Sequence, residues 1–437
     1  MLRAFANAFR TPDLRRKLLF VLFIVGVFRL GSQLPTPGVN VANVQTCFHQ
    51  AGSQGVYGLI NLFSGGALLQ LTVFALGIMP YITASIILQL LVVVIPRLEK
   101  LKDEGQAGQT KITQYTRYLT LALAVLQATG IVALARSGRL IPGCHDSQGQ
   151  PLPLLWDSGV GTAILMVVVM TAGTGIIMWL GELITDRGIG NGMSILIFTQ
   201  VVARFPSALW QVEKAKGPWI FAGVIILGLA IIAAVVFIEQ AQRRIPVQYA
   251  RRMVGRRMFG GSSTYIPIKV NQAGVIPVIF AASLLYLPAL AVQFNQNTTN
   301  PILQWLSKYM VTGDNPIYMI IYFAMVIFFT YFYVAITFNP EEVADNMKKY
   351  GGFIPGIRAG RPTQEYLNYV LSRITAPGST YLGLVALIPL VALTLVNANQ
   401  NFPFGGTSLL IMVGVALDTV KQIESQLQQR NYEGFLR

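Results

Sequence analysis

Residues 77–91 read GIMPYITASIILQLL, and residues 274–288 read GVIPVIFAASLLYLP. When the two stretches are aligned, six of the fifteen positions are identical, including the leading glycine and the proline three residues after it. Both lie in apolar runs that are long enough to be helices in a membrane. Because the motif recurs within one chain of 437 residues, it predicts an internal repeat of two halves.

The composition is typical of a membrane protein. Hydrophobic residues make up 53% of the chain, charged residues only 12%, and the mean hydropathy is +0.55. A soluble protein has roughly 25% charged residues. Apolar runs of about twenty residues, which as helices cross a ~30 Å hydrocarbon core, recur along the chain. They predict ten transmembrane helices near residues 18–34, 71–95, 118–135, 160–180, 189–203, 217–238, 273–294, 316–338, 376–396 and 405–420. The expected fold class is therefore an all-α membrane protein.

Lys and Arg are distributed unevenly over the predicted loops. Of the 33, the two terminal tails and the loops on one side hold 26, the loops on the other side hold six, and Arg29 lies within the first span. The positive-inside rule therefore places both termini in the cytoplasm. Arg15-Arg16-Lys17 and the apolar run after it resemble a signal peptide without a small-residue cleavage site, so we expect an uncleaved first span.

In this topology the two repeated stretches cross the membrane in opposite directions. A second pair, GMSILIF from Gly192 and GTSLLIM from Gly406, has the same relation. Matching segments of opposite direction predict two inverted five-helix halves around a central pore, residues 1–203 and residues 204–437. The alternative is that apolar helices resemble one another by chance.

Branched or flexible apolar side chains from both halves are expected to meet at the centre. Four of them form two pairs spaced four residues apart, so that each pair shares one helix face. The other two occupy repeat-equivalent positions in the second half. The six residues are Ile78, Ile82, Met193, Ile197, Ile279 and Ile411. Taken singly, each residue is better interpreted as an ordinary lipid-facing or packing residue, and only the symmetry favours a shared centre.

Ionisable residues are scarce in the predicted spans, where Arg29 and Asp418 lie near span ends. A secondary transporter with inverted repeats is the alternative function, but it normally needs a carboxylate or His at the midplane. An intramembrane protease would need a Ser–His or paired-Asp site. His49 and His145 lie in predicted external loops outside any metal-binding or catalytic motif. We therefore expect no enzymatic activity, no catalytic residue, no metal and no cofactor.

The two cysteines, Cys47 and Cys144, both fall in predicted external loops. They could form a disulfide in an oxidising compartment. Unpaired loop cysteines are the alternative, and the sequence favours it.

Two long cytoplasmic loops, 239–272 and 339–375, have sequences that indicate order. The second begins with Asn339 as a helix cap and Pro340 in the first turn, and it continues into a tip rich in Gly and Pro. Such basic loops set topology or contact anionic lipid, or they dock RNA phosphates or an acidic partner. The basic residues in question are Arg243, Arg244, Arg251, Arg252, Arg256, Arg257, Arg358 and Arg361.

Several motifs resemble the SecY family, the large channel subunits of the bacterial Sec preprotein translocase. They are INLFSGGAL, FALGIMPYITASIILQLL, QYTRY, MWLGELITDRGIGNGMSI, QRRIPVQYARR, KVNQAGVIPVIFA, FNPEEVADNMKKYGGFIPGIR and FGGTSLLI. The resemblance covers nearly the whole chain. It implies a channel in the cytoplasmic (inner) membrane that passes unfolded secretory polypeptides across and releases transmembrane segments sideways into lipid.

The resemblance also implies roles for individual residues. The six central apolar residues become a pore ring, from which Met193 departs mildly because the family's ring is mostly isoleucine. Residues 57–67 become a plug, a short displaceable helix. Spans two and three face spans seven and eight as a lateral gate, with Thr83, Gln127 and Asn271 as polar groups. The plug residues are Ile60, Asn61, Leu62, Phe63, Ser64, Gly65 and Gly66.

Partners are implied in the same way. They are the small membrane subunits SecE and SecG, the motor ATPase SecA, the ribosome through contacts of its rRNA with the basic loops, signal peptides, nascent chains and membrane lipid. The sequence leaves open which motor drives transport, the open or closed state and the oligomeric state.

Overall fold

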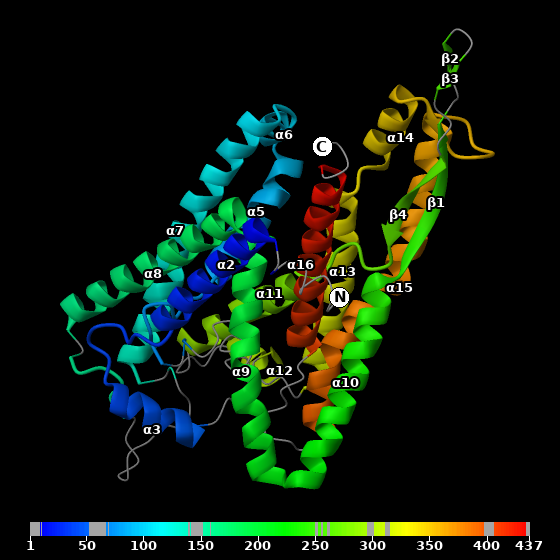
Figure 1. Ribbon diagram of the computed structural model, residues 1–437. Coiled ribbons are helices and arrows are strands. Elements are labelled where there is room, and N and C mark those ends of the chain that lie inside the picture. Colours follow the sequence, from blue (N-terminus) through cyan, green and yellow to red (C-terminus); the bar gives the residue numbers. More distant parts are fainter. Residues whose placement is uncertain are drawn as a thin grey trace.

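The structure is a computed structural model that describes residues 11–51, 70–138, 152–157, 159–249, 263–294, 301–310, 315–396 and 406–433, with 9, 67, 68, 140, 252–254 and 257–259. It consists mainly of helices (Figure 1), and a helix lies at each of the ten predicted spans. These ten are α2 (Pro12–Gly31), α5 (Met79–Val94), α7 (Gln106–Arg136), α8 (Val160–Arg187), α9 (Gly192–Lys216), α10 (Pro218–Gln240), α11 (Ile276–Phe294), α13 (Pro316–Thr337), α15 (Arg361–Val396) and α16 (Gly406–Glu433). Shorter helices are α3 (Val41–Ala51), α6 (Pro96–Asp103), α12 (Pro301–Met310) and α14 (Pro340–Lys349).

Four helices of the described residues are long and apolar enough by themselves to cross a membrane. These segments are Gln106–Arg136, Val160–Arg187, Phe221–Gln240 and Pro316–Lys349. A fifth is added if α5 and the helix after it, which are bent by 105°, count as one span. The chain is thus a multi-pass membrane protein, and the count of ten spans goes beyond what helix length and composition establish.

Helix starts follow local chemistry. The side-chain oxygens of Asn191, Asn315 and Asn339 accept hydrogen bonds from backbone N–H groups at the starts of α9, α13 and α14. Proline occupies the first turn of α2, α5, α6, α10, α13 and α14, where its missing N–H costs nothing.

The expectation of an all-α chain is wrong for loop 239–272. There, β1 (Gln242–Tyr249) pairs antiparallel with β4 (Ser263–Lys269), and β5 (Gly352–Phe353) adds to the other edge of β1. A smaller hairpin pairs β2 (Arg252–Val254) with β3 (Arg257–Phe259). Ile245 and Val247 of β1 are buried and alternate with exposed residues, which is the period of a strand with one covered face. The arginine pairs of the loop mask this alternation in the sequence.

The second predicted span starts later than expected. Residues 71–78 form turns, and α5 begins only at Met79. Leu71 has a φ of 48° and Gly77 a φ of 57°, both in the left-handed region that does not continue a helix. The apolar run is therefore about one third turn, residues 71–78, and two thirds helix, Met79–Val94.

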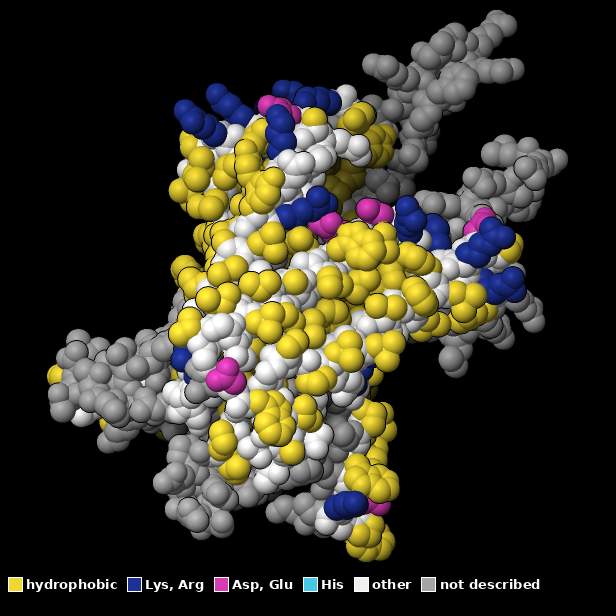
Figure 2. Space-filling model, turned by 90° about the vertical axis from the view of Figure 1, so that its left-hand side faces the viewer, with side chains coloured by type: hydrophobic (Ala, Val, Ile, Leu, Met, Phe, Trp, Pro, Cys, Tyr) yellow, Lys and Arg dark blue, Asp and Glu magenta, His cyan; other side chains and the backbone are white. Residues whose placement is uncertain are grey.

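The surface supports placement in a bilayer. Figure 2 shows hydrophobic side chains over the middle of one face and most Lys and Arg of that face toward its upper end. On α10, Trp219 and Phe237 are 89% and 78% exposed. Large apolar side chains on the outside of a helix are stable in lipid, because there they contact hydrocarbon and not water.

Buried apolar residues form separate clusters. One cluster draws on α3, α7, α8 and the turns before α5, and another draws on α10, α11, α13, α15 and α16. A third lies between these two and takes residues from α2, α5, α8, α9, α11 and α16. This third group, called the central cluster below, contains residues from both the N-terminal and the C-terminal part of the chain.

Candidate functional site

The predicted ring residues come together in the central cluster. Ile78 precedes α5, Ile82 lies in α5, Met193 and Ile197 lie in α9, Ile279 lies in α11 and Ile411 lies in α16. Five of them are buried members of the cluster, and Ile82 is partly buried and packs against it.

Met193 has a specific neighbour within this cluster. A Cβ atom added to Gly181 of α8 would collide with the sulfur of Met193 and would approach Leu196 to 3.4 Å. The thioether therefore lies over the surface of α8. A flexible methionine fits such an irregular gap better than a branched isoleucine does.

The chain turns sharply before α5. Gly77 has a φ of 57°, and the N–H groups of Tyr81 and Ile82 donate to the carbonyl of Ile78 at 3.1 Å each. The N–H of Val73 donates to the carbonyl of Leu34 at 2.9 Å, just beyond the end of α2. Gly173 of α8 packs so closely on the Val73 carbonyl that a Cβ there would overlap it.

The turn before α11 repeats this geometry at the same offsets. Gly274 has a φ of 60°, and the N–H groups of Val278 and Ile279 donate to the carbonyl of Val275 at 3.2 and 3.3 Å. The N–H of Val270 donates to the carbonyl of Ala241 at 3.0 Å, directly after α10. A Cβ added to Gly378 of α15 would overlap the Val270 carbonyl, as at Gly173.

The three predicted gate residues have different surroundings. Thr83 donates its hydroxyl to the carbonyl of Met79 in its own helix at 2.9 Å, and Gln127 is half-buried on α7. Asn271 donates its side-chain amide to Glu239 Oε1 at 2.6 Å and to the Gly274 carbonyl at 3.2 Å. Their meeting at one gate stays a prediction.

Sequence reasoning missed two polar contacts between segments distant in sequence, one between α10 and the turn before α11 and one between α7 and α8. One is Asn271–Glu239, and the other is an ion pair in which both nitrogens of the Arg117 fork bind Glu182 at 2.8 Å, joining α7 to α8. The partners are 32 and 65 residues apart in sequence. No local spacing rule connects residues so distant. The only signal is a charged residue near the end of an apolar run.

The structure resolves the cysteine alternatives. Cys47 on α3 is fully buried and disulfide-bonded, so the favoured interpretation of unpaired cysteines is wrong. The chain has one other cysteine, Cys144, which lies outside the described residues. The covering of Cys47 by apolar neighbours was not visible in the sequence of its loop.

The plug residues Ile60, Asn61, Leu62, Phe63, Ser64, Gly65 and Gly66 lie outside the described residues, and so do Arg251 and Arg256. Arg243 and Arg244 are exposed on β1, and Arg244 lies over the ring of Tyr265 at 4.9 Å. Arg252 and Arg257 lie in β2 and β3. Arg358 is exposed, and its carbonyl accepts the hydroxyl of Thr363 at 2.8 Å.

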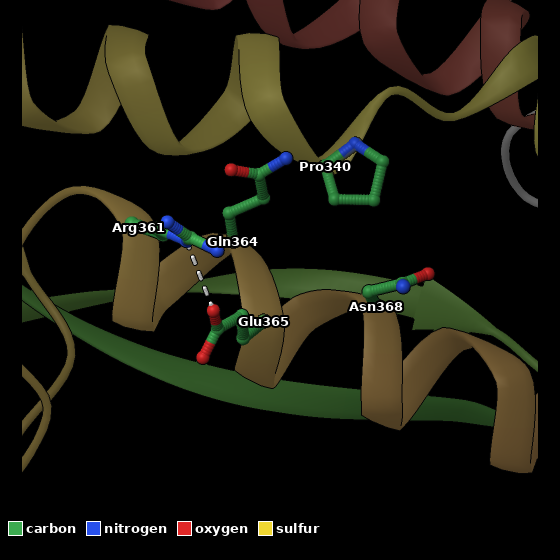
Figure 3. A pocket seen from close by; sticks show the side chains of 5 residues that line it. All are labelled: Pro340, Arg361, Gln364, Glu365 and Asn368. Atoms are coloured by element: carbon green, nitrogen blue, oxygen red, sulfur yellow. Dashed lines mark hydrogen bonds and ion pairs between the residues drawn. The ribbon is translucent and has the colours of Figure 1, made fainter.

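A shallow pocket lies beside Arg361 at the start of α15. It has a volume of about 330 Å³ and is lined by Pro340, Arg361, Gln364, Glu365 and Asn368 (Figure 3). Arg361 Nε binds Glu365 Oε1 at 3.2 Å. Both side chains are mostly exposed, so water screens this pair and leaves the charges available to a partner.

Helices with outward apolar faces that meet at an apolar centre are typical of a multi-pass membrane protein. The turns before α5 and α11 share one geometry. The described residues include no group of three His, Cys, Asp or Glu side chains that could hold a metal ion.

The chain matches the SecY family over residues 72–420 and belongs to it. It is thus a protein-conducting channel subunit of the translocase, not an enzyme. It is 68% identical to the protein translocase subunit SecY of Streptomyces coelicolor and 60% identical to that of Mycobacterium tuberculosis, each match covering 100% of both chains.

Solved structures share the fold. A structure described as "a protein conducting channel" matches with a TM-score of 0.60 at 21% identity, covering 94% of this chain and 91% of the other. A second, with a TM-score of 0.58 at 20% identity and the same coverage, concerns a SecY plug domain that stabilises the closed channel. A third, Sec61 in a canine ribosome-channel complex, has a TM-score of 0.56 at 19% identity, again with 94% and 91% coverage.

Proposed function

We propose that the chain forms a closed conduit through the cytoplasmic membrane, sealed by a ring of six apolar side chains, through which unfolded secretory polypeptides pass. The observation that carries the proposal is the central cluster, where Ile78, Met193, Ile197, Ile279 and Ile411 are buried together. Apolar atoms around a narrow opening exclude ions because water leaves such a constriction. A chain in transit displaces the side chains by rotamer changes and binds to none of them.

Ten membrane spans in two inverted halves, residues 1–203 and 204–437, form the second part of the proposal. A helix at each predicted span supports it, as does the distribution of Lys and Arg. The strongest support is the pair of turns. In each half a left-handed glycine precedes the second helix, and the residue four positions earlier is held by one backbone hydrogen bond and one glycine contact. Chance similarity of apolar helices does not produce matching offsets in two turns.

Lateral release of apolar segments into lipid would occur between α5 and α7 on one side and α11 and α13 on the other. α5 packs on α7 and α11 packs on α13, so each pair moves as a unit. Thr83, Gln127 and Asn271 would supply polar contacts across the opening. Such bonds contribute only ~0.6 to 2 kcal/mol each, so an arriving apolar segment can replace them.

Residues 57–67 would be the plug, a second barrier on the external side. The support is their composition, apolar and too short to span, with Gly65-Gly66 as a hinge. The SecY structure whose plug domain stabilises the closed state adds to it.

Cytoplasmic partners would dock on the basic loops. The exposed Arg243, Arg244, Arg358 and Arg361 support contacts with the ribosome or with SecA, and the canine structure is a ribosome-channel complex of a similar fold. SecE and SecG would associate within the membrane, and signal peptides and nascent chains would enter from the cytoplasm. The alternative function for inverted repeats, a secondary transporter, has no observation in its favour.

The test is reconstitution. The purified protein with its small partner subunits, placed in vesicles with a motor, should carry a signal-bearing polypeptide into a protease-protected space. Vesicles without the protein are the control. If protection depends on the protein, the conduit proposal holds, and full degradation in both samples overturns it.

A further inference from the structure

The two matching turns are fastened by different chemistry at one equivalent position. Three residues before the left-handed glycine stands Phe74 in the first half and Asn271 in the second. Phe74 is 5% exposed and stacks on Phe28 of α2, with ring centroids 5.7 Å apart. Asn271 is 3% exposed and donates to Glu239 in the last turn of α10.

The same helices anchor both turns. Phe28 lies near the end of α2, and Glu239 lies at the end of α10, the corresponding helices of the two halves. In the second half one amide nitrogen makes both bonds, to Glu239 Oε1 at 2.6 Å and to the Gly274 carbonyl at 3.2 Å. Glu239 thereby fixes a side chain that in turn fixes the left-handed turn at the start of α11.

The Phe74–Phe28 stack and the Asn271–Glu239 hydrogen bond differ in how they can be broken. A stacked ring pair buries apolar area and holds until the rings separate. A side-chain amide can exchange one acceptor for another, so it leaves its partner without losing a bond. Asn271 Oδ1 is buried and has no partner, which leaves this side chain able to accept a further hydrogen bond. The turn in the second half is therefore held by a hydrogen bond that can be exchanged for another one.

We propose that Glu239 is a positioning residue of the channel: it holds Asn271, and through it the start of α11, in the closed arrangement in which Ile279 joins the ring. This inference rests on the proposed gate between α5 and α11. Opening then begins in the second half, when Asn271 leaves Glu239, while the Phe74–Phe28 stack keeps the first half in place. A charged neighbour pair, Lys269 Nζ and Asp418 Oδ1 at 3.7 Å, lies at the same membrane surface.

The experiment compares two precursors in reconstituted vesicles, one with an intact signal and one whose apolar signal core is shortened. The measured quantity is the ratio of their translocation rates. Removing the acceptor by Glu239→Leu should raise the relative rate of the weak-signal precursor roughly 3- to 30-fold, the range that one hydrogen bond between membrane helices corresponds to. Asn271→Leu should do the same, and the double variant should add little because the two side chains act as a unit.

Three controls keep the test decisive. Glu239→Gln retains an acceptor oxygen and should stay near the parent ratio. Phe74→Leu should reduce transport of both precursors without changing their ratio. Glu213→Leu, which removes an exposed carboxylate from the far end of α9, should change nothing.

The outcomes separate the hypotheses. An unchanged ratio in Glu239→Leu, or an equal rise in Phe74→Leu, overturns the inference while leaving the conduit intact. If Glu239→Leu fails to transport the intact precursor, Glu239→Gln and Asn271→Leu decide, and a Gln variant with a raised ratio counts against hydrogen-bond holding. No transport by the parent protein would instead reject the proposed function.

Discussion

At the scale of the residue, two glycines determine how closely the turns are held. Gly173 and Gly378 each lie against a backbone carbonyl with no room for a methyl group. A carbonyl cannot move aside as the end of a flexible side chain does, because it belongs to the hydrogen-bonded turn. Glycine is therefore required at both positions by contact, not by backbone conformation.

Gly173→Ala should lower the stability of the protein by about 1 to 3 kcal/mol, the usual cost of overpacking. The measurement is thermal or denaturant unfolding of the protein in detergent. Gly175→Ala on the same helix is the matched control, because its new methyl would meet only Leu121 Cδ2 at 3.8 Å, an ordinary contact. Equal stability of the two variants would show that the Val73 carbonyl is not a fixed neighbour.

Replacing Ile82 and Ile279 together with glycine should make the resting channel leak ions. The change removes apolar atoms contributed by both halves to the central cluster and lets water enter the constriction. Single-channel recording in planar bilayers measures the leak. Ile226→Gly on the exposed surface of α10 is the control. A double variant as silent as the parent would mean that the seal lies elsewhere.

At the scale of the element, each gate helix is held by its own half. α5 starts at a turn anchored to α2 and α8, and α11 starts at a turn anchored to α10 and α15. The two helices are therefore parts of separate bodies that touch through the ring. Motion between the bodies would change this contact, and release of Asn271 from Glu239 would free the turn before α11 while the turn before α5 stays in place.

A short crosslink between cysteines at Ile82 and Ile279 should stop secretion and membrane insertion alike, since it joins the two bodies. Translocation and integration assays before and after reduction give the answer. The matched control places cysteines at Phe323 and Gly383, which touch within the second half. Normal secretion through the crosslinked channel would locate the opening between other helices.

Arg358→Glu should slow motor- or ribosome-driven translocation several-fold while leaving folding and insertion intact. The Arg358 side chain is exposed on a turn, so charge reversal is expected to affect a partner's surface and not the fold. Translocation rate against expression level is the measure. Lys348→Glu on the same loop tests whether any charge reversal suffices. Full activity of Arg358→Glu removes the docking role.

At the scale of the whole molecule, the positions of the ten helices were predictable because each carries a long apolar run. The convergence of the ring residues was predictable only through the repeat, since Ile411 is otherwise an ordinary apolar residue. The strands of loop 239–272 were not predictable, because the arginines hide the alternation of buried and exposed residues. The Glu239–Asn271 contact was not predictable either, because it joins the end of α10 to a turn 32 residues further along the chain, and only the fold brings the two together.

Deleting residues 57–67 should give a channel that leaks at rest but still translocates selectively. In the proposed function the ring and the plug would be two barriers in series, and the ring would re-form after each passage. Conductance in planar bilayers and translocation in vesicles are measured on the same preparation. A deletion as electrically silent as the parent removes the sealing role of this segment.

The length of α15 has a mechanical consequence. Its 36 residues begin at the pocket beside Arg361, and about 25 Å further along, Gly378 rests on the turn before α11. If a partner docks there as proposed, the segment from Arg361 to Gly378 would act as a lever that pivots at the turn, and a tilt of about 5° would move its tip by ~2 Å over that helical length. A partner pushing on the tip would do work on α11 from outside the pore.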